Sequence, residues 1–218
     1  MTRIACLHTA DSNISVFDSA LAELGKDEVK LIHAVRSDLL FEAEAAGAMT
    51  PEIERQAIDQ LCALSVDVDA VIMTCSTLGP AAALANKVSK CAVFRVDEAL
   101  ALKAARYGGK IVALCAVETT VDPTKKLFES IAIGTGANVD VQLVKGAWGL
   151  FKAGDQKAYL LCIAKSASEA LAGGASVVAL AQSSMAGAKF LIPETSSVLD
   201  SPTEGLLAAI SAANSINR

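Results

Sequence analysis

Short apolar runs rich in β-branched residues alternate along the chain with longer amphipathic or alanine-rich stretches. This alternation is typical of repeated strand–helix units that build a parallel sheet covered by helices. We predict strands at residues 3–7, 29–34, 70–74, 91–96, 110–117, 138–145, 176–181 and 197–199. We predict helices at residues 15–24, 51–64, 80–88, 98–107, 123–135, 155–172 and 203–215. The pattern therefore predicts an α/β protein.

Three prolines help to place the starts of the helices. Pro51, Pro80 and Pro123 each stand where a proline suits the first helical turn, because the backbone N–H that it lacks has no partner there. Glycine-containing turns at residues 107–110 and 134–138 then lead from a helix into the next strand.

The order of elements after residue 110 loosely repeats the order from residue 3, which indicates a duplicated α/β architecture. We assign residues 1–96 and 197–218 to an N-terminal lobe and residues 97–196 to a C-terminal lobe, with the final helix returning to the first lobe. In open parallel sheets, ligands bind beyond the carboxyl ends of the strands. We therefore expect two doubly wound parallel sheets with the active site in the cleft between the lobes.

Hydrophobic residues make up 53% of the chain and aromatic residues only 4%, so the core must consist mainly of Ala, Val, Leu and Ile. Proteins that bind single-stranded nucleic acids need aromatic faces on which bases stack, and this chain has few. The formal net charge of -5 also disfavours binding to a phosphate backbone. We expect no nucleic-acid partner.

The mean hydropathy of +0.44 raises the question of a membrane. No apolar run approaches the roughly 18 to 20 residues that a spanning helix needs. The N-terminus enters a predicted strand without the apolar stretch and cleavage site of a signal peptide. We expect a cytoplasmic protein with no membrane partner, and we expect its six scattered cysteines to be thiols.

Motifs for metals and nucleotides are missing from the sequence. It contains two histidines, no HExxH motif and no paired-cysteine spacing, so we predict no metal site. Its glycine-rich turns lack both GxGxxG directly after a strand and the GxxxxGKS/T pattern, which leaves nucleotide binding without support. We expect the protein to work without a cofactor.

Small polar residues gather at four predicted strand exits, where ligands of parallel sheets bind. These exits are residues 8–13, 74–80, 118–120 and 182–185. A doubly wound pair of lobes could bring all four to one cleft.

Cys75 stands at the most informative exit. A strand of sequence Ala-Val-Ile-Met precedes it, and Ser76 and Thr77 lead into a helix that starts at Pro80. Backbone N–H groups at such a helix start bind carboxylates and oxyanions, and they lower the pKa of a cysteine. We expect a thiolate that takes a proton from the carbon beside a carboxylate, returns one to a carbanion, or attacks as a nucleophile.

Each of these residues also has a purely structural interpretation. Cysteine is among the most buried residue types, and we interpret Cys115, inside a predicted strand, as a packing residue. His8 could bind substrate or could be a hydrogen-bonded structural histidine. Thr119 and Thr120 could bind substrate or could cap the helix that follows them.

In these polar exits and the segments around them, the chain resembles the aspartate/glutamate/hydantoin racemase superfamily, which also contains maleate isomerases and arylmalonate decarboxylases. The resemblance spans nearly the whole chain and rests on four segments. They are Thr-Cys-Ser-Thr-Leu-Gly at residues 74–79, Val-Glu-Thr-Thr at 117–120, residues 177–186, and Val-Leu-Asp-Ser-Pro at 198–202.

The resemblance implies two similar lobes related by a pseudo-twofold axis, with one cysteine from each lobe on opposite faces of the substrate. It implies catalysis without metal or pyridoxal phosphate, and a homo-oligomer. Cys75 matches the first of these cysteines. Gln182 occupies the position of the second, by alignment of residues 181–186 with the pattern Gly-Cys-x-Gly-Met of the family. Because an amide cannot accept and return a proton near neutral pH, racemization by two bases is not expected in its usual form.

Three functions remain open, all with a small carboxylate or dicarboxylate as ligand. A single thiol could transfer a proton at the α-carbon, as the resemblance to arylmalonate decarboxylases suggests. It could add covalently to an unsaturated dicarboxylate, as maleate isomerases do, or the protein could bind a carboxylate without turnover. We expect recognition by amides and hydroxyls more than by arginine. The candidate substrate-binding residues are His8, Thr9, Ser76, Thr77, Thr119, Thr120, Gln182 and Ser183.

Overall fold

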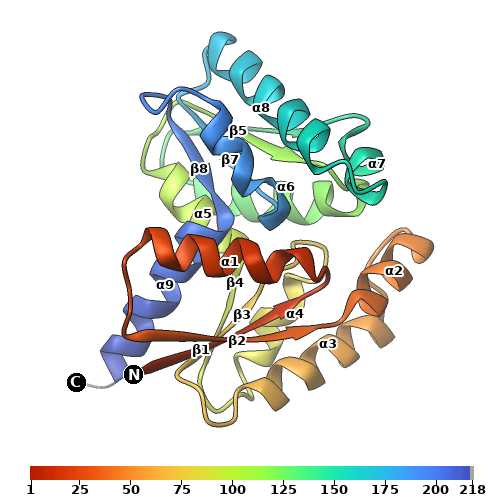
Figure 1. Cartoon of the computed structure of the whole chain (residues 1–218), viewed down its shortest axis with the longest axis vertical. Helices are drawn as coiled ribbons and strands as arrows, with labels where there is room; N and C mark the ends of the chain where they lie inside the picture. The colour runs from red at the N-terminus through yellow and green to blue at the C-terminus, as the bar shows by residue number, and fades with distance from the viewer. Residues whose placement is uncertain (217–218) are drawn as a thin grey trace. The chain divides into compact units, whose positions relative to one another are not determined.

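The computed structural model in Figure 1 describes residues 1–216 and divides the chain into two compact units. The first unit contains residues 1–99 and 202–216, and the second contains residues 100–201. Each unit holds one parallel sheet of four strands.

The sheet of the first unit has its parallel strands in the order β2-β1-β3-β4. These strands are β1 (Thr2–His8), β2 (Val29–Val35), β3 (Ala70–Met73) and β4 (Ala92–Arg95). Residue 7 of β1 pairs with residue 73 of β3, and residue 73 pairs in turn with residue 95 of β4. The carboxyl ends of these three strands therefore lie side by side at one end of the sheet.

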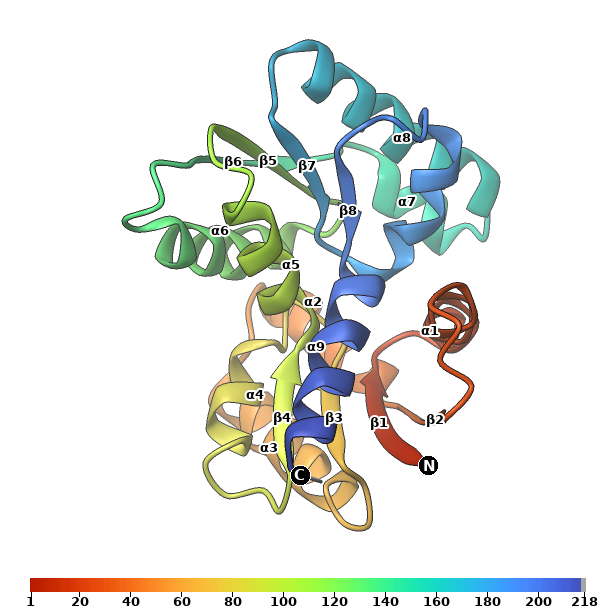
Figure 2. The ribbon, with the colours of Figure 1, turned by 90° about the vertical axis from the view of Figure 1, so that its left-hand side faces the viewer.

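Helices cover both faces of this sheet because successive side chains of each strand point to opposite faces. Leu7 and Met73 pack on one face against α2 (Ser37–Ala46), α3 (Pro51–Leu64) and α4 (Pro80–Ala85). Ile4 and Ile72 pack on the other face against α1 (Ser12–Glu23) and α9 (Ser201–Ile216). Figure 2 shows α9 beside β3 and β4.

The sheet of the second unit has an equivalent order, β6-β5-β7-β8, and is also parallel. Its strands are β5 (Lys110–Cys115), β6 (Asn138–Leu143), β7 (Val177–Leu180) and β8 (Val198–Asp200). Helix α8 (Gln156–Ala172) and the 3-10 segment η1 (Ser183–Leu191) pack on one face. Helices α5 (Val96–Ala105) and α6 (Glu118–Ala132) pack on the other, and α7 (Ala147–Lys152) completes the unit.

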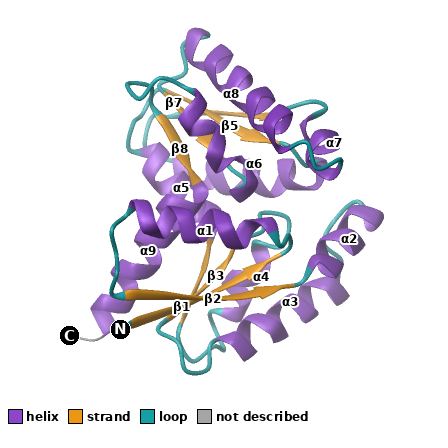
Figure 3. Ribbon diagram, in the orientation of Figure 1, coloured by secondary structure: helices purple, strands orange, loops and turns teal. Residues whose placement is uncertain are grey.

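Figure 3 shows strands enclosed by helices in each unit. The prediction of an α/β protein with two doubly wound parallel sheets is therefore confirmed, and every predicted strand lies within two residues of an observed one. Three elements were not predicted: α2, α7 and η1. Their hydrophobic positions follow no extended helical period, because each is short and buries only a few side chains.

The structure corrects two boundaries. Pro123 does not lie in the first turn of its helix, because α6 already begins at Glu118. The backbone N–H and the hydroxyl of Thr120 both donate to the carbonyl of Val117, which closes the first turn before the proline. Residues 197–201 belong to the second unit, because Val198 pairs with Val178 of β7.

None of the helices formed within residues 1–216 is both long enough and apolar enough to cross a lipid bilayer.

Candidate active site

Cys75 lies just beyond the carboxyl end of β3, beside the end of β1. Because residue 7 pairs with residue 73, the positions two residues further along each chain, Thr9 and Cys75, also come together. The hydroxyl of Thr9 and the backbone N–H groups of Thr77 and Leu78 donate hydrogen bonds to the sulfur of Cys75. The structure thus surrounds Cys75 with three donors, two of which come from its own turn.

Cys75 is buried but not sealed. Its exposed fraction is 8%, whereas Cys6 and Cys115, the other buried cysteines of the described chain, have none. Full burial of Cys115 within β5 agrees with its interpretation as a packing residue. Among these three cysteines, Cys75 is the one that keeps some exposed surface.

The expectation of a lowered pKa for Cys75 is wrong for the protein without ligand. Burial raises the pKa of this thiol, since a thiolate loses more hydration than a thiol does. The donors Thr9, Leu78 and Thr77 counteract the rise, and the negative charge of Asp97 adds to it. The sulfur is therefore a protonated thiol. The hydrogen-bond donors around it are placed to stabilise a negative charge when the sulfur becomes a thiolate.

His8, at the end of β1, has both ring nitrogens engaged by protein groups. Its Nδ1 lies 2.9 Å from Oγ1 of Thr74, and its Nε2 lies 2.8 Å from Nδ1 of His33. The side chain is completely buried. Of the two interpretations of His8 given above, these contacts support the hydrogen-bonded structural histidine.

The hydrogen bonds around His8 assign its tautomer. The hydroxyl of Thr74 donates to the carbonyl of Leu7 at 2.9 Å, so it accepts from an N–H at Nδ1 of His8. Nε2 of His8 then accepts from Nδ1 of His33, and Nε2 of His33 lies 3.2 Å from Oδ1 of Asp18. Burial, and next the charge of His33, lower the pKa of His8 to about 3, which keeps this ring neutral.

Cys6 lies on the same face as the two histidines, and the three offer metal-ligand atoms within 4.8 Å of one another. The facing nitrogens of His8 and His33 are already joined by a hydrogen bond at 2.8 Å. Burial, and next the charge of Asp18, raise the pKa of the Cys6 thiol, which opposes the thiolate form that binds metals. The arrangement therefore fits a hydrogen-bonded network better than a metal site.

Arg95 was not predicted from the sequence as a residue of the site. It ends β4, and its Nε and Nη2 donate to the two carboxylate oxygens of Asp97 at 2.8 and 2.9 Å. The Asp97 side chain is completely buried and that of Arg95 is 12% exposed. A Cβ on Gly79 would lie 2.9 Å from this guanidinium, so the ion pair packs directly on the turn that holds Cys75. The sequence did contain a pattern that could have revealed this ion pair: an arginine two residues before an aspartate at the end of a predicted strand.

In the second unit, Gln182 follows β7 and reaches the end of β5. Its Oε1 accepts hydrogen bonds from the backbone N–H of Ala116 and, at 3.2 Å, from that of Val117. The side-chain oxygen therefore binds the backbone that leads into α6. This contact gives Gln182 a structural role whatever else it does.

The other predicted residues of the second unit lie near the same strand ends. Thr120 is buried, and its hydroxyl donates to the carbonyl of Val117 at 2.6 Å, as its capping interpretation requires. Ser183 is buried at the start of η1, while Thr119 is partly exposed. The structure thus groups Thr9, Cys75, Ser76 and Thr77 in one unit, and Thr119, Thr120, Gln182 and Ser183 in the other.

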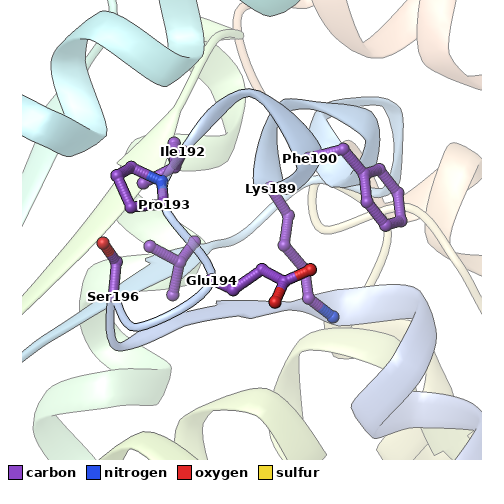
Figure 4. Close-up of a pocket in the computed structure, with 7 residues that line it drawn as sticks. Lys189, Phe190, Ile192, Pro193, Glu194 and Ser196 are labelled. Carbon is purple, nitrogen blue, oxygen red and sulfur yellow. The ribbon is translucent and has the colours of Figure 1, made fainter.

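A cavity of about 290 Å³ in the second unit holds none of the predicted residues. Figure 4 shows its lining side chains, which come from the end of η1, the segment before β8 and the start of β8. Lys189 lies at this cavity, and its Nζ is 3.1 Å from the carboxylate of Asp200. The lining residues are Lys189, Phe190, Ile192, Pro193, Glu194, Ser196 and Val198.

Three solved racemases have a fold similar to that of this chain. An aspartate racemase from Picrophilus torridus is similar with a TM-score of 0.76 and 17% identity, over 98% of this chain and 95% of that one. An allantoin racemase from Pseudomonas fluorescens has a TM-score of 0.69 and 18% identity, over 98% and 91%. A glutamate racemase from Bacillus anthracis has a TM-score of 0.63 and 12% identity, over 99% and 82%.

No curated protein sequence matches the chain significantly. The model of the Asp/Glu/hydantoin racemase family, however, matches residues 8–209, a span that includes the second sheet, strands β2, β3 and β4 of the first sheet and the turn of Cys75. The chain therefore belongs to the Asp/Glu/hydantoin racemase family.

Proposed function

We propose that this protein is an isomerase-type or decarboxylase-like enzyme that transfers a proton at the α-carbon of a small carboxylate through Cys75, without a cofactor. The observation that supports this proposal is the set of three hydrogen-bond donors on the sulfur of a cysteine that stays slightly exposed at the end of a central strand. Family membership supports the reaction class.

The chemistry follows from the protonation state of the thiol. Because burial raises the pKa of Cys75, the resting group is an S–H, which is a proton donor. When a malonate-type substrate loses CO2, the electrons of the broken C–C bond leave an enediolate, and its α-carbon takes this proton from Cys75. The thiolate that remains accepts hydrogen bonds from Thr9, Thr77 and Leu78. In the reverse direction the thiolate removes an α-proton and becomes the thiol again.

The presence of Gln182 excludes a symmetric reaction in which two cysteines exchange protons with the substrate. A neutral amide does not exchange protons with carbon acids near neutral pH, and Oε1 of Gln182 is already bound to two backbone N–H groups. We therefore propose proton transfer on one face of the substrate. This predicts a single stereochemical outcome, whereas a two-base racemase gives both.

Two other functions serve as alternatives. Covalent addition to maleate, as in maleate isomerases, needs the thiolate as nucleophile, which the raised pKa of Cys75 disfavours in the free protein. Carboxylate binding without turnover needs no proton transfer at all. Both alternatives use Cys75 where the structure places it. They differ from the leading proposal because the first gives another product and the second gives none.

The test is an incubation in deuterated water with amino acids, hydantoins, substituted malonates and maleate, followed by NMR. Deuterium at the α-carbon, or decarboxylation with one handed product, supports the proposal, and Cys75→Ser should abolish either signal. Cys91→Ser is the matched control, because Cys91 is a partly buried thiol of the same unit. Absence of turnover across the panel, with ligands still raising the melting temperature, would instead identify a binding protein.

Homo-oligomerisation and a cytoplasmic location stay predictions. Light scattering on the purified chain checks the first, and fractionation of the source cells checks the second.

A further inference from the structure

We propose that Arg95, held in place by Asp97, binds a carboxylate group of the ligand beside Cys75. This inference depends on the proposed function only for the choice of Cys75 as the reacting group. It adds a charged recognition residue to a site for which neutral donors were expected, and it defines the ligand as an anion with a planar carboxylate.

The position of Arg95 follows from the sheet. β3 and β4 are parallel neighbours with residue 73 opposite residue 95, so the side chain of Arg95 leaves its strand beside the turn that begins two residues after Met73. A Cβ on Gly79 would lie 2.9 Å from both Nε and Nη2 of Arg95. The N–H groups of Thr77 and Leu78 contact the sulfur of Cys75 from the same short turn. The guanidinium of Arg95 therefore packs against Gly79, four residues after Cys75 in the same turn.

Asp97 determines which edge of the guanidinium is available. Its two oxygens take the hydrogens of Nε and Nη2, so the hydrogens of Nη1 point away from Asp97. A guanidinium can bind two carboxylates along different edges, and its charge is permanent. Arg95 can thus hold Asp97 on one side and a ligand carboxylate on another.

The energetics of the pair suggest a use beyond stability. Removing both charges from water costs desolvation energy that a buried ion pair often does not recover, and apolar substitutes of the same size are frequently as stable. Asp97 is completely buried and Arg95 nearly so. A group kept at this cost directly on the turn of Cys75 is well suited to a ligand that needs a fixed positive charge.

A second pair in the same sheet provides a comparison. Arg36 and Asp38 follow β2 with the same spacing, and their side chains form the same kind of bidentate contact. They are more exposed, at 28% and 51%, and Arg36 also donates to Gln56. β2 is the strand at the opposite edge of the sheet from β4. This pair is therefore a matched control with the same chemistry at a different place.

The test measures alkylation of Cys75 by iodoacetate and by iodoacetamide, two reagents that differ by a carboxylate in place of an amide. Both react by attack of the thiolate sulfur on carbon with loss of iodide, so the ratio of their rate constants does not depend on the fraction of thiolate. Mass spectrometry at about pH 9, where the thiol reacts measurably, gives both rates at Cys75.

The principal variant is Arg95→Gln combined with Asp97→Asn, which removes the guanidinium without leaving a buried charge and without changing the net charge. We expect the iodoacetate to iodoacetamide ratio at Cys75 to fall about five-fold or more. The double variant Arg36→Gln with Asp38→Asn should leave the ratio unchanged. A ratio within about two-fold of the unaltered protein in a folded Arg95 variant would overturn the proposal.

A measurement on the unaltered protein does not depend on the folding of any variant. Malonate should slow the reaction of Cys75 with iodoacetamide, and malonamide, its uncharged analogue, should not. Equal protection by both compounds would contradict a carboxylate site. If deuterium exchange is absent while the ratio falls as expected, the enzymatic proposal fails and the carboxylate site stands. If exchange occurs while the ratio is unchanged, the carboxylate site at Arg95 fails and the enzymatic proposal stands.

Discussion

Nε2 of His8 and Nδ1 of His33 lie 2.8 Å apart, so two histidines on neighbouring strands share one hydrogen bond. Phe17 of α1 covers the ring of His8 at a centroid distance of 5.2 Å, and the carboxylate of Asp18 on the same helix lies 3.2 Å from Nε2 of His33. The network ties α1 to the sheet beside the loop that contains Thr9. It therefore supports the position of one donor to Cys75.

The depressed pKa of His8 predicts that the protein loses stability in mild acid. The folded state holds this pKa at about 3, while the unfolded chain titrates near the ordinary value of 6.5. Between these values the unfolded chain binds a proton that the folded protein does not. The free energy of unfolding should therefore be complete above about pH 6.5 and should fall by up to about 1.4 kcal/mol per pH unit below it.

The variant His8→Gln tests this by urea unfolding at several pH values between about 4 and 7. It cannot take up the proton, so its stability should change less steeply with pH than that of the unaltered protein. Carboxylates such as Asp38 contribute equally to both proteins. Parallel curves would show that His8 does not titrate as described.

Thr9→Val should make Cys75 less reactive. The hydroxyl of Thr9 donates to the sulfur and lowers the pKa of Cys75 against the effect of burial. Without it the pKa rises further, and the rate of alkylation by iodoacetamide at constant pH should fall about five-fold, the value of one hydrogen bond of about 1 kcal/mol.

Thr9→Ser keeps the hydroxyl and should react as the unaltered protein does. Thr124→Val is the control for removing a buried threonine hydroxyl, since Oγ1 of Thr124 has no hydrogen-bond partner. The interpretation of Thr9 would be wrong if both valine variants left the rate at Cys75 unaltered.

Gln182→Cys should destabilise the second unit. The shorter side chain cannot accept hydrogen bonds from the N–H groups of Ala116 and Val117. Leaving these donors unsatisfied should cost about 1–3 kcal/mol in the free energy of unfolding. Gln182→Glu retains an acceptor oxygen and should lose less. Equal stability of the cysteine variant in denaturant unfolding would argue against the structural role of the amide.

Tyr159→Phe tests a buried hydrogen bond of the second core. Oη of Tyr159 lies 2.7 Å from Oγ of Ser184, and the ring is completely buried. Loss of the hydroxyl should reduce the free energy of unfolding by about 1–2 kcal/mol, because the serine hydroxyl loses its partner. Tyr107→Phe, at a side chain that is 46% exposed, should change it by less than about 0.5 kcal/mol. Thermal unfolding of the two variants side by side gives the comparison.

Much of the fold was readable from the chain because each element contains its own signal. The buried strand before Cys75 and the prolines that start α3 and α4 lie within a few residues of the structure they specify. Pro123 shows the limit of such local signals, because the threonines before it continue the helix through hydrogen bonds that the proline does not affect. The short α7 was missed for the same reason: six residues are too few to show a period.

The sequence by itself determined the order of strands and helices, the polar strand exits, and Cys75 as the cysteine at such an exit. Only the tertiary structure decided which groups surround it. Thr9 and Arg95 reach its turn because β1 and β4 are the neighbours of β3, and no local pattern encodes that adjacency. The tertiary structure also reversed the expected direction of the pKa of Cys75, because desolvation depends on every segment packed around the sulfur, while the amides of the turn are local.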